Sequence, residues 1–95
     1  MVKILSFNTN KSILAVLDRL VNKQEGWEGL RAADLETAKQ LVVEHDFDVV
    51  LLGAGTGDAE EQALAELTAN KKTKYVQHYG GGSGLLYAEV MGVLD

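Results

Sequence analysis

The residues best suited to chemistry lie in the segment 77–84, which reads QHYGGGSG and follows a short apolar run. A glycine-rich turn that leads from a strand into a helix presents unpaired N–H groups together with the positive end of the helix dipole. Such a turn suits an anionic group, so a phosphate-bearing or carboxylate ligand is one interpretation of this segment. The interpretation we favour is a tight turn whose glycines allow positive φ, with Ser83 as the helix N-cap.

The glycines of this segment form no complete phosphate-binding motif. Gly80 and Gly82 fit the first two positions of G-x-G-x-x-G, but Leu85 stands at the third, and no Gly-Lys-Ser/Thr follows. In a doubly wound sheet, ligands bind beyond the carboxyl ends of the strands, where this segment would meet the turn 8–10 and the loop 53–58. The candidate ligand-binding residues are therefore Asn8, Asn10, His78, Gly80, Gly81, Gly82, Ser83 and Gly84.

His78 could act as a general base or carry a phosphoryl group, because imidazole titrates near neutral pH. The sequence shows no acidic partner for it, so the alternative is a strand residue with local hydrogen bonds. No serine, histidine and acid set has the context of a nucleophile elbow, and two histidines do not make a metal site. We therefore expect no catalytic residue, no metal, no cofactor and no enzymatic activity.

Composition narrows the classes of function. The 95 residues suffice for one domain, 1–95, and 46% of them are hydrophobic, which is ample for a core. A formal charge of −5 disfavours nucleic-acid binding, because an acidic surface repels phosphates. There is no cysteine for disulfides or thiolate chemistry, no signal-peptide pattern and no apolar run near the ~18 residues of a membrane span. These features predict a cytoplasmic protein without membrane contact.

The elements that would position these residues alternate along the chain. Four apolar runs predict strands, at 2–7, 27–33, 47–52 and 74–79. Each run is followed by an amphipathic stretch that predicts a helix. Because strands separated by helices need right-handed crossover connections, the βαβαβαβα order predicts a parallel sheet with helices on both faces, a three-layer α/β sandwich.

Polar residues mark the expected beginnings of these helices. Asn10 and Asp34 fit N-cap positions, and Asp58 with Glu61 three residues later fits a capping box. If they bind no ligand, Asn8 and Asn10 are explained as turn and cap residues. The residues expected on buried helix faces are Ile13, Leu14, Leu17, Leu20, Val21, Leu35, Ala38, Leu41, Val42, Ala59, Ala63, Leu64, Leu67, Leu85, Leu86, Val90, Val93 and Leu94.

Three segments of this pattern resemble a bacterial response-regulator receiver domain. They are KIL at 3–5, WEGLRAADLETA at 27–38 and FDVVLL at 47–52. The resemblance covers about residues 2–79. It implies a flavodoxin-like, receiver-like fold with strand order 2-1-3-4 and a role in signal transduction.

The chain departs from the receiver pattern where a receiver is phosphorylated. Gly53 stands at the phosphoacceptor position, and Asn8 and Thr9 stand where the acidic pair for a divalent metal would be. The switch serine or threonine falls near residues 77–78, and the lysine of a fifth strand has no counterpart. The resemblance therefore implies a truncated pseudo-receiver that works without phosphorylation, as a regulatory or protein-interaction module.

Loss of a fifth strand and helix would expose the edge of the fourth strand and part of one sheet face. Either the last helix folds over this face, or a second copy of the chain covers it. Two-fold homodimers are the commonest soluble oligomers, so we expect a homodimer with a protein partner in signalling. The alternative is a small-molecule binding protein or minor enzyme that holds an anionic ligand in the segment 80–84.

Overall fold

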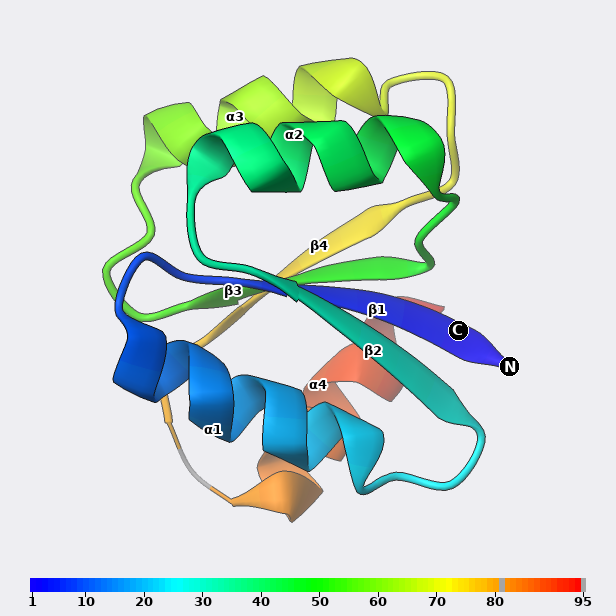
Figure 1. Ribbon diagram of the computed structural model, residues 1–95. Coiled ribbons are helices and arrows are strands. Elements are labelled where there is room, and N and C mark those ends of the chain that lie inside the picture. Colours follow the sequence, from blue (N-terminus) through cyan, green and yellow to red (C-terminus); the bar gives the residue numbers. More distant parts are fainter. Residues whose placement is uncertain (81, 95) are drawn as a thin grey trace.

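Within the part of the chain that the structure describes, four strands alternate with four helices, as the apolar pattern predicts. The computed structural model describes residues 1–80 and 82–94 (Figure 1). The strands are β1 (Val2–Phe7), β2 (Trp27–Ala32), β3 (Val49–Gly53) and β4 (Lys74–His78). The helices are α1 (Lys11–Asn22), α2 (Leu35–Glu44), α3 (Asp58–Leu67) and α4 (Ser83–Leu94).

The four strands form one parallel sheet in the order β2-β1-β3-β4, which confirms the expected topology. All five residues of β3 are buried, as a run that is apolar on both faces requires. The connection from β1 to β2 crosses the sheet in the opposite direction from the two later connections between strands. Because such connections are right-handed, α1 lies on one face of the sheet and α2 and α3 lie on the other (Figure 1).

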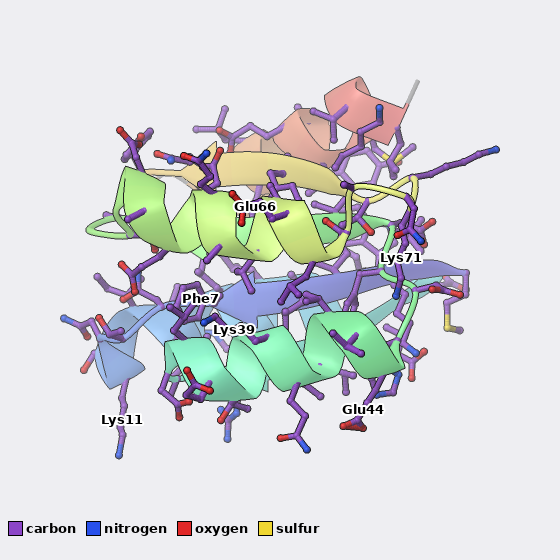
Figure 2. The ribbon with its side chains drawn as sticks, turned by 90° about the horizontal axis from the view of Figure 1, so that it is seen from above. Phe7, Lys11, Lys39, Glu44, Glu66 and Lys71 are labelled. Atoms are coloured by element: carbon purple, nitrogen blue, oxygen red, sulfur yellow. The ribbon has the colours of Figure 1, made fainter. Side chains whose placement is uncertain are left out.

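Each face of the sheet has its own hydrophobic core. Phe7 is fully buried beneath α2 and α3, which lie side by side over the sheet in Figure 2. It belongs to a cluster with Ala38 and Val42 of α2 and Leu64 of α3. The cluster on the opposite face comprises Ile4, Leu17, Val21, Trp27, Val49, Leu51, Val76, Leu86 and Val90.

Helix α4 covers the same sheet face as α1. Its Leu86 and Val90 side chains are fully buried in the core of that face. Its Tyr87 ring stacks on the Trp27 ring, with centroids 5.5 Å apart and planes within 7° of parallel. Of the two expected ways to cover this face, the structure shows the first, in which the last helix itself packs against the sheet.

Two of the four expected helix caps are present, and at the other two helices the expected residue is not the N-cap. The Asn10 side chain accepts hydrogen bonds from Ser12 and Ile13 N–H groups, and the Asp34 side chain accepts one from Thr37. At α3 the N-cap is Gly57 and not Asp58, and Glu60 rather than Glu61 accepts the Gly57 N–H at 3.0 Å. The expected cap Ser83 is the first residue of α4, because Leu86 N–H donates to the Gly82 carbonyl. The side chain of Ser83 lies outside the described part of the structure.

Most residues expected on buried helix faces are buried or half-buried, but Ala59, Leu67 and Leu85 are exposed. Leu67 at the end of α3 is 40% exposed, and Leu85 in the first turn of α4 is 52% exposed. Leu67 and Leu85 stand beside buried neighbours in the sequence, so the apolar pattern assigns them to the core. All three residues lie in the first or last turn of their helices.

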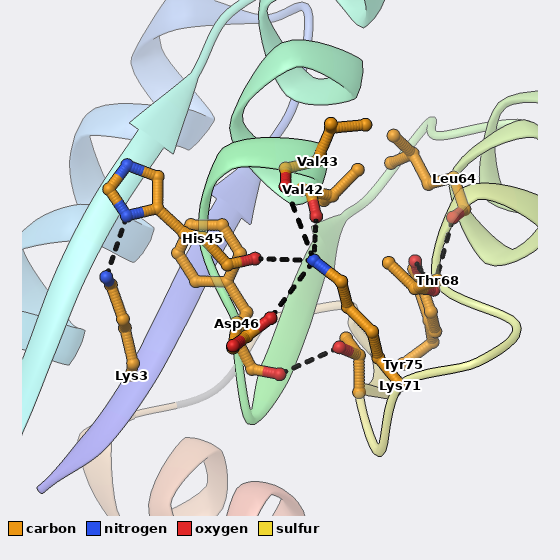
Figure 3. Close-up of polar contacts among 11 residues, drawn as sticks. Lys3, Val42, Val43, His45, Asp46, Leu64, Thr68, Lys71 and Tyr75 are labelled. Carbon is orange, nitrogen blue, oxygen red and sulfur yellow. Dashed lines mark hydrogen bonds and ion pairs between the residues drawn. The ribbon is translucent and has the colours of Figure 1, made fainter.

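Lys71, from the loop before β4, caps the C-terminal end of α2 (Figure 3). Lys71 Nζ donates to the carbonyl oxygens of Val42 at 2.8 Å and His45 at 3.2 Å, and lies 3.1 Å from Asp46 Oδ1. The last carbonyls of a helix have no partner within the helix, and the helix dipole is negative at this end. A cation there therefore gains both hydrogen bonds and a favourable interaction with the dipole. Lys71 is thus a capping residue for the C-terminal end of α2.

Candidate functional site

The carboxyl end of the sheet is organised around Asn8, which follows β1 and is 2% exposed. Its Nδ2 donates to the Ala54 carbonyl at 2.8 Å, and its Oδ1 accepts from the Asn10 N–H at 2.7 Å. Both ends of the amide are therefore engaged with the protein. Asn10 in turn caps α1, so these two candidate ligand residues have the turn and cap roles that were their alternative.

Gly53, at the end of β3, lies directly against the Asn8 side chain. A Cβ built on Gly53 would approach Asn8 Nδ2 closer than 3.0 Å and Ile13 Cγ2 to 2.9 Å, distances that side chains do not tolerate without movement. Glycine is thus required here by the close approach of its neighbours. The space that an acceptor side chain would need is filled by the Asn8 amide and the α1 helix.

His78 ends β4 and has an acidic partner that sequence reasoning missed. The ring is 4% exposed, and its Nδ1 lies 2.5 Å from Glu89 Oε1 on α4. Glu89 stands three residues after Leu86 and one before Val90, both fully buried. Helical spacing therefore places it at the margin of the packed face of α4, and this signal could have paired it with the strand that α4 covers.

His78 also lines a largely apolar cavity of about 390 Å³. Residues of α1 and residues at the end of β4 contribute most of its lining. The lining residues are Ser12, Ile13, Val16, Leu17, Leu20, Ala54, His78, Tyr79 and Gly80. The structure thus brings His78 and Gly80 together at one cavity, while it directs the Asn8 and Asn10 side chains to other hydrogen bonds.

Among the described residues of the glycine segment, Gly80 is the position where the backbone conformation requires glycine. Gly80 has φ +126°, a region that other residues rarely adopt. Gly82 and Gly84 are exposed, and a Cβ on either would meet nothing within 4 Å. Gly81 lies outside the described residues. The ligand-binding role of this segment stays a prediction.

Acidic and imidazole groups do not gather into a metal site in the described part of the chain. No group of three histidine, aspartate or glutamate side chains there could hold an ion. None of the helices among residues 1–80 and 82–94 has the length and apolar character that a membrane crossing requires.

Comparison with known proteins finds solved structures with the same architecture. No protein-family model and no curated protein matches the chain. Among solved structures, a response regulator from Desulfuromonas acetoxidans is similar with a TM-score of 0.73 and 14% sequence identity, over 99% of this chain and 97% of that one. The fold is that of a receiver domain.

Two further receiver-like structures come from proteins described by a role in pilus assembly. The CpaE pilus assembly protein from Burkholderia thailandensis has a TM-score of 0.66 and 23% identity, over 98% of this chain and 80% of that one. A pilus assembly-related protein from Burkholderia pseudomallei has a TM-score of 0.57 and 25% identity, over 98% and 72%. The receiver-like fold therefore holds over nearly the whole chain.

Proposed function

We propose that this chain is a phosphorylation-independent regulatory module of the receiver type, which acts by contact with other proteins and not as an enzyme. The observation that carries the proposal is the packing of Asn8 against Gly53. An aspartyl phosphate needs a carboxylate on β3 and a divalent metal beside it. Here the acceptor position has no side chain, the neighbouring position is a neutral amide, and the two are in contact.

Exposed large side chains at the end of β4 and in α4 support the interaction role. Tyr79, Leu85 and Tyr87 are 74%, 52% and 44% exposed. Interfaces between proteins are enriched in aromatic side chains such as tyrosine. In this proposal Tyr79 and Leu85 contribute to a contact that joins two copies of the chain in a homodimer, and a signalling partner is recognised by the dimer.

The proposal treats residues 1–95 as one domain in the cytoplasm. Its formal charge of −5 gives no attraction for nucleic acid. The receiver-like fold supports the regulatory class, because one similar solved structure is that of a response regulator. An anion held by the segment 80–84 remains the alternative expected from sequence, and no second observation favours it.

Incubation with acetyl phosphate and Mg²⁺ tests the central claim. We expect no aspartyl phosphate by intact-mass spectrometry and no change in molar mass by light scattering. A receiver domain that retains its acceptor aspartate serves as the positive control for the reagent. Stoichiometric labelling of an aspartate, reversed by hydroxylamine, would contradict the proposal.

A further inference from the structure

The cavity beside His78 combines apolar walls with one buried polar group. Ile13, Val16, Leu17 and Leu20 of α1 supply methyl groups along most of its surface. Its volume of about 390 Å³ lies within the range of small-molecule sites, which are typically concave, mostly apolar and equipped with few polar groups. Such a cavity can hold a compact apolar body of about one ring.

The polar group has a defined orientation. Glu89 lies 2.5 Å from His78 Nδ1, which makes Nδ1 the protonated nitrogen when the ring is neutral and the carboxylate accepts. Because Glu89 occupies Nδ1, the ring nitrogen available to a ligand is Nε2. In the neutral ring Nε2 is a hydrogen-bond acceptor, so it favours a ligand with a hydrogen-bond donor.

The surroundings disfavour a charged ligand. Apolar walls give no compensation for the lost hydration of an ion. An anion would also lie near the Glu89 carboxylate in a chain of charge −5, whereas a cation would find that carboxylate already bonded to the ring. A hydroxyl group needs only one partner, and Nε2 supplies it.

We propose that this cavity binds a small neutral alcohol or phenol, with its hydroxyl donating to His78 Nε2 and its apolar body against α1. This site shares His78 and Gly80 with the ligand site predicted from sequence, but it differs in ligand class, because it takes a neutral molecule and not an anion. It goes beyond the proposed regulatory function and does not depend on it.

The first experiment is a titration of ¹⁵N-labelled protein with p-cresol and, separately, with toluene, followed by NMR. We expect saturable shifts of the amides of Val16, Ala54 and Tyr79 with p-cresol. Toluene has the same ring and methyl group without the hydroxyl, so it should bind about fivefold more weakly, the value of one hydrogen bond. Equal affinity for the two probes, or no saturable shift at the cavity, would overturn the proposal.

Two variants locate the site. Val16→Trp, at a partly exposed position on α1, fills the cavity without entering the core and should abolish the p-cresol shifts. Val43→Trp, at an exposed position of α2 outside this cavity, is the matched control and should bind normally. Both variants are checked for a dispersed spectrum before titration. Undiminished binding by well-folded Val16→Trp would refute the location.

A third variant tests the hydroxyl contact. His78→Phe removes Nε2 but keeps a ring of similar size, so the preference for p-cresol over toluene should fall from about fivefold to near unity. If His78→Phe does not fold, the ¹⁵N shift of His78 Nε2 in the wild-type protein gives the same information. We expect p-cresol, and not toluene, to move it. An unmoved Nε2 resonance would refute the contact.

Discussion

The Asn8 amide lies where a side chain on Gly53 would have to begin. Asn8 Nδ2 donates to the carbonyl of Ala54, the residue after Gly53. This hydrogen bond keeps the Asn8 side chain next to Gly53. In the receiver pattern these two positions carry a metal-binding acid and the phosphoacceptor. The two differences from the receiver pattern, at positions 8 and 53, are therefore linked. Glycine at position 53 has no Cβ, and the Asn8 side chain occupies the space that this atom would need.

This contact predicts a cost for restoring the acceptor. Gly53→Asp should lower the free energy of unfolding by about 1–3 kcal/mol, because overpacking of a well-filled site forces its neighbours to move. Urea denaturation followed by circular dichroism measures the change. An unchanged denaturation midpoint would show that the Asn8 side chain yields freely.

A double variant separates crowding from a general effect of the new carboxylate. Asn8→Gly removes the crowded amide, so Asn8→Gly with Gly53→Asp should lose less stability than the sum of the single changes, by about 1 kcal/mol. Strict additivity would mean that the two residues do not compete for the same space.

The His78–Glu89 pair predicts an asymmetry between two substitutions of Glu89. Glu89→Ala leaves a buried ring N–H without its acceptor, which should cost about 1–3 kcal/mol of stability. Glu89→Gln keeps an acceptor oxygen and should cost less. Glu66→Ala, at an exposed position of α3 (Figure 2), is the control for loss of a helix glutamate and should stay within about 0.5 kcal/mol. Equal losses for Glu89→Ala and Glu66→Ala would assign no role to the pair.

The contacts of Lys71 predict that its substitution lowers stability much more than substitution of the adjacent Lys72. Lys71→Met removes the charged donor from the α2 carbonyls and should destabilise the fold by about 1.5–3 kcal/mol, the range for hydrogen bonds to charged groups. Lys72→Met, at the next and exposed position, should change stability by no more than about 0.5 kcal/mol. Thermal and urea unfolding of the two variants give the comparison, and similar values would argue against the capping role.

The N-cap of α2, Asp34, predicts that the stability of the fold depends on pH. Hydrogen bonds from Thr37, first from its backbone and then from its hydroxyl, hold the pKa of Asp34 below its ordinary value of 3.8. A carboxyl whose pKa is lower in the folded state adds stability above the unfolded pKa, and that stability is lost as the pH falls through the folded value. Asp34→Asn keeps a cap without the charge, so the wild-type advantage over it should be constant near pH 7 and shrink below about pH 4. An advantage that does not change with pH would show that the charge contributes nothing.

The accuracy of the sequence predictions depended on the range of the interactions behind them. The caps at Asn10 and Asp34 use partners two or three residues away, and the strands follow from local apolar runs, so both were foreseeable. The pairing of His78 with Glu89 depends on how α4 crosses the sheet, and the contact of Asn8 with Gly53 spans 45 residues. Periodicity predicts the apolar face of a helix but not where along the helix that face stops being covered, and the exposed Ala59, Leu67 and Leu85 all lie in terminal turns.

The exposed position of Leu85 gives the sharpest test of homodimer formation. Multi-angle light scattering over a concentration series should show a dimer of the wild-type chain. Leu85→Glu places a charge in the proposed interface and should yield a monomer with an unchanged circular dichroism spectrum, because an unpaired charge buried in an interface is costly. Val43→Glu, which changes a similarly exposed apolar residue on α2, should remain dimeric. A monomeric wild-type chain would refute the homodimer, and dimer loss in Val43→Glu alone would move the interface to the opposite sheet face.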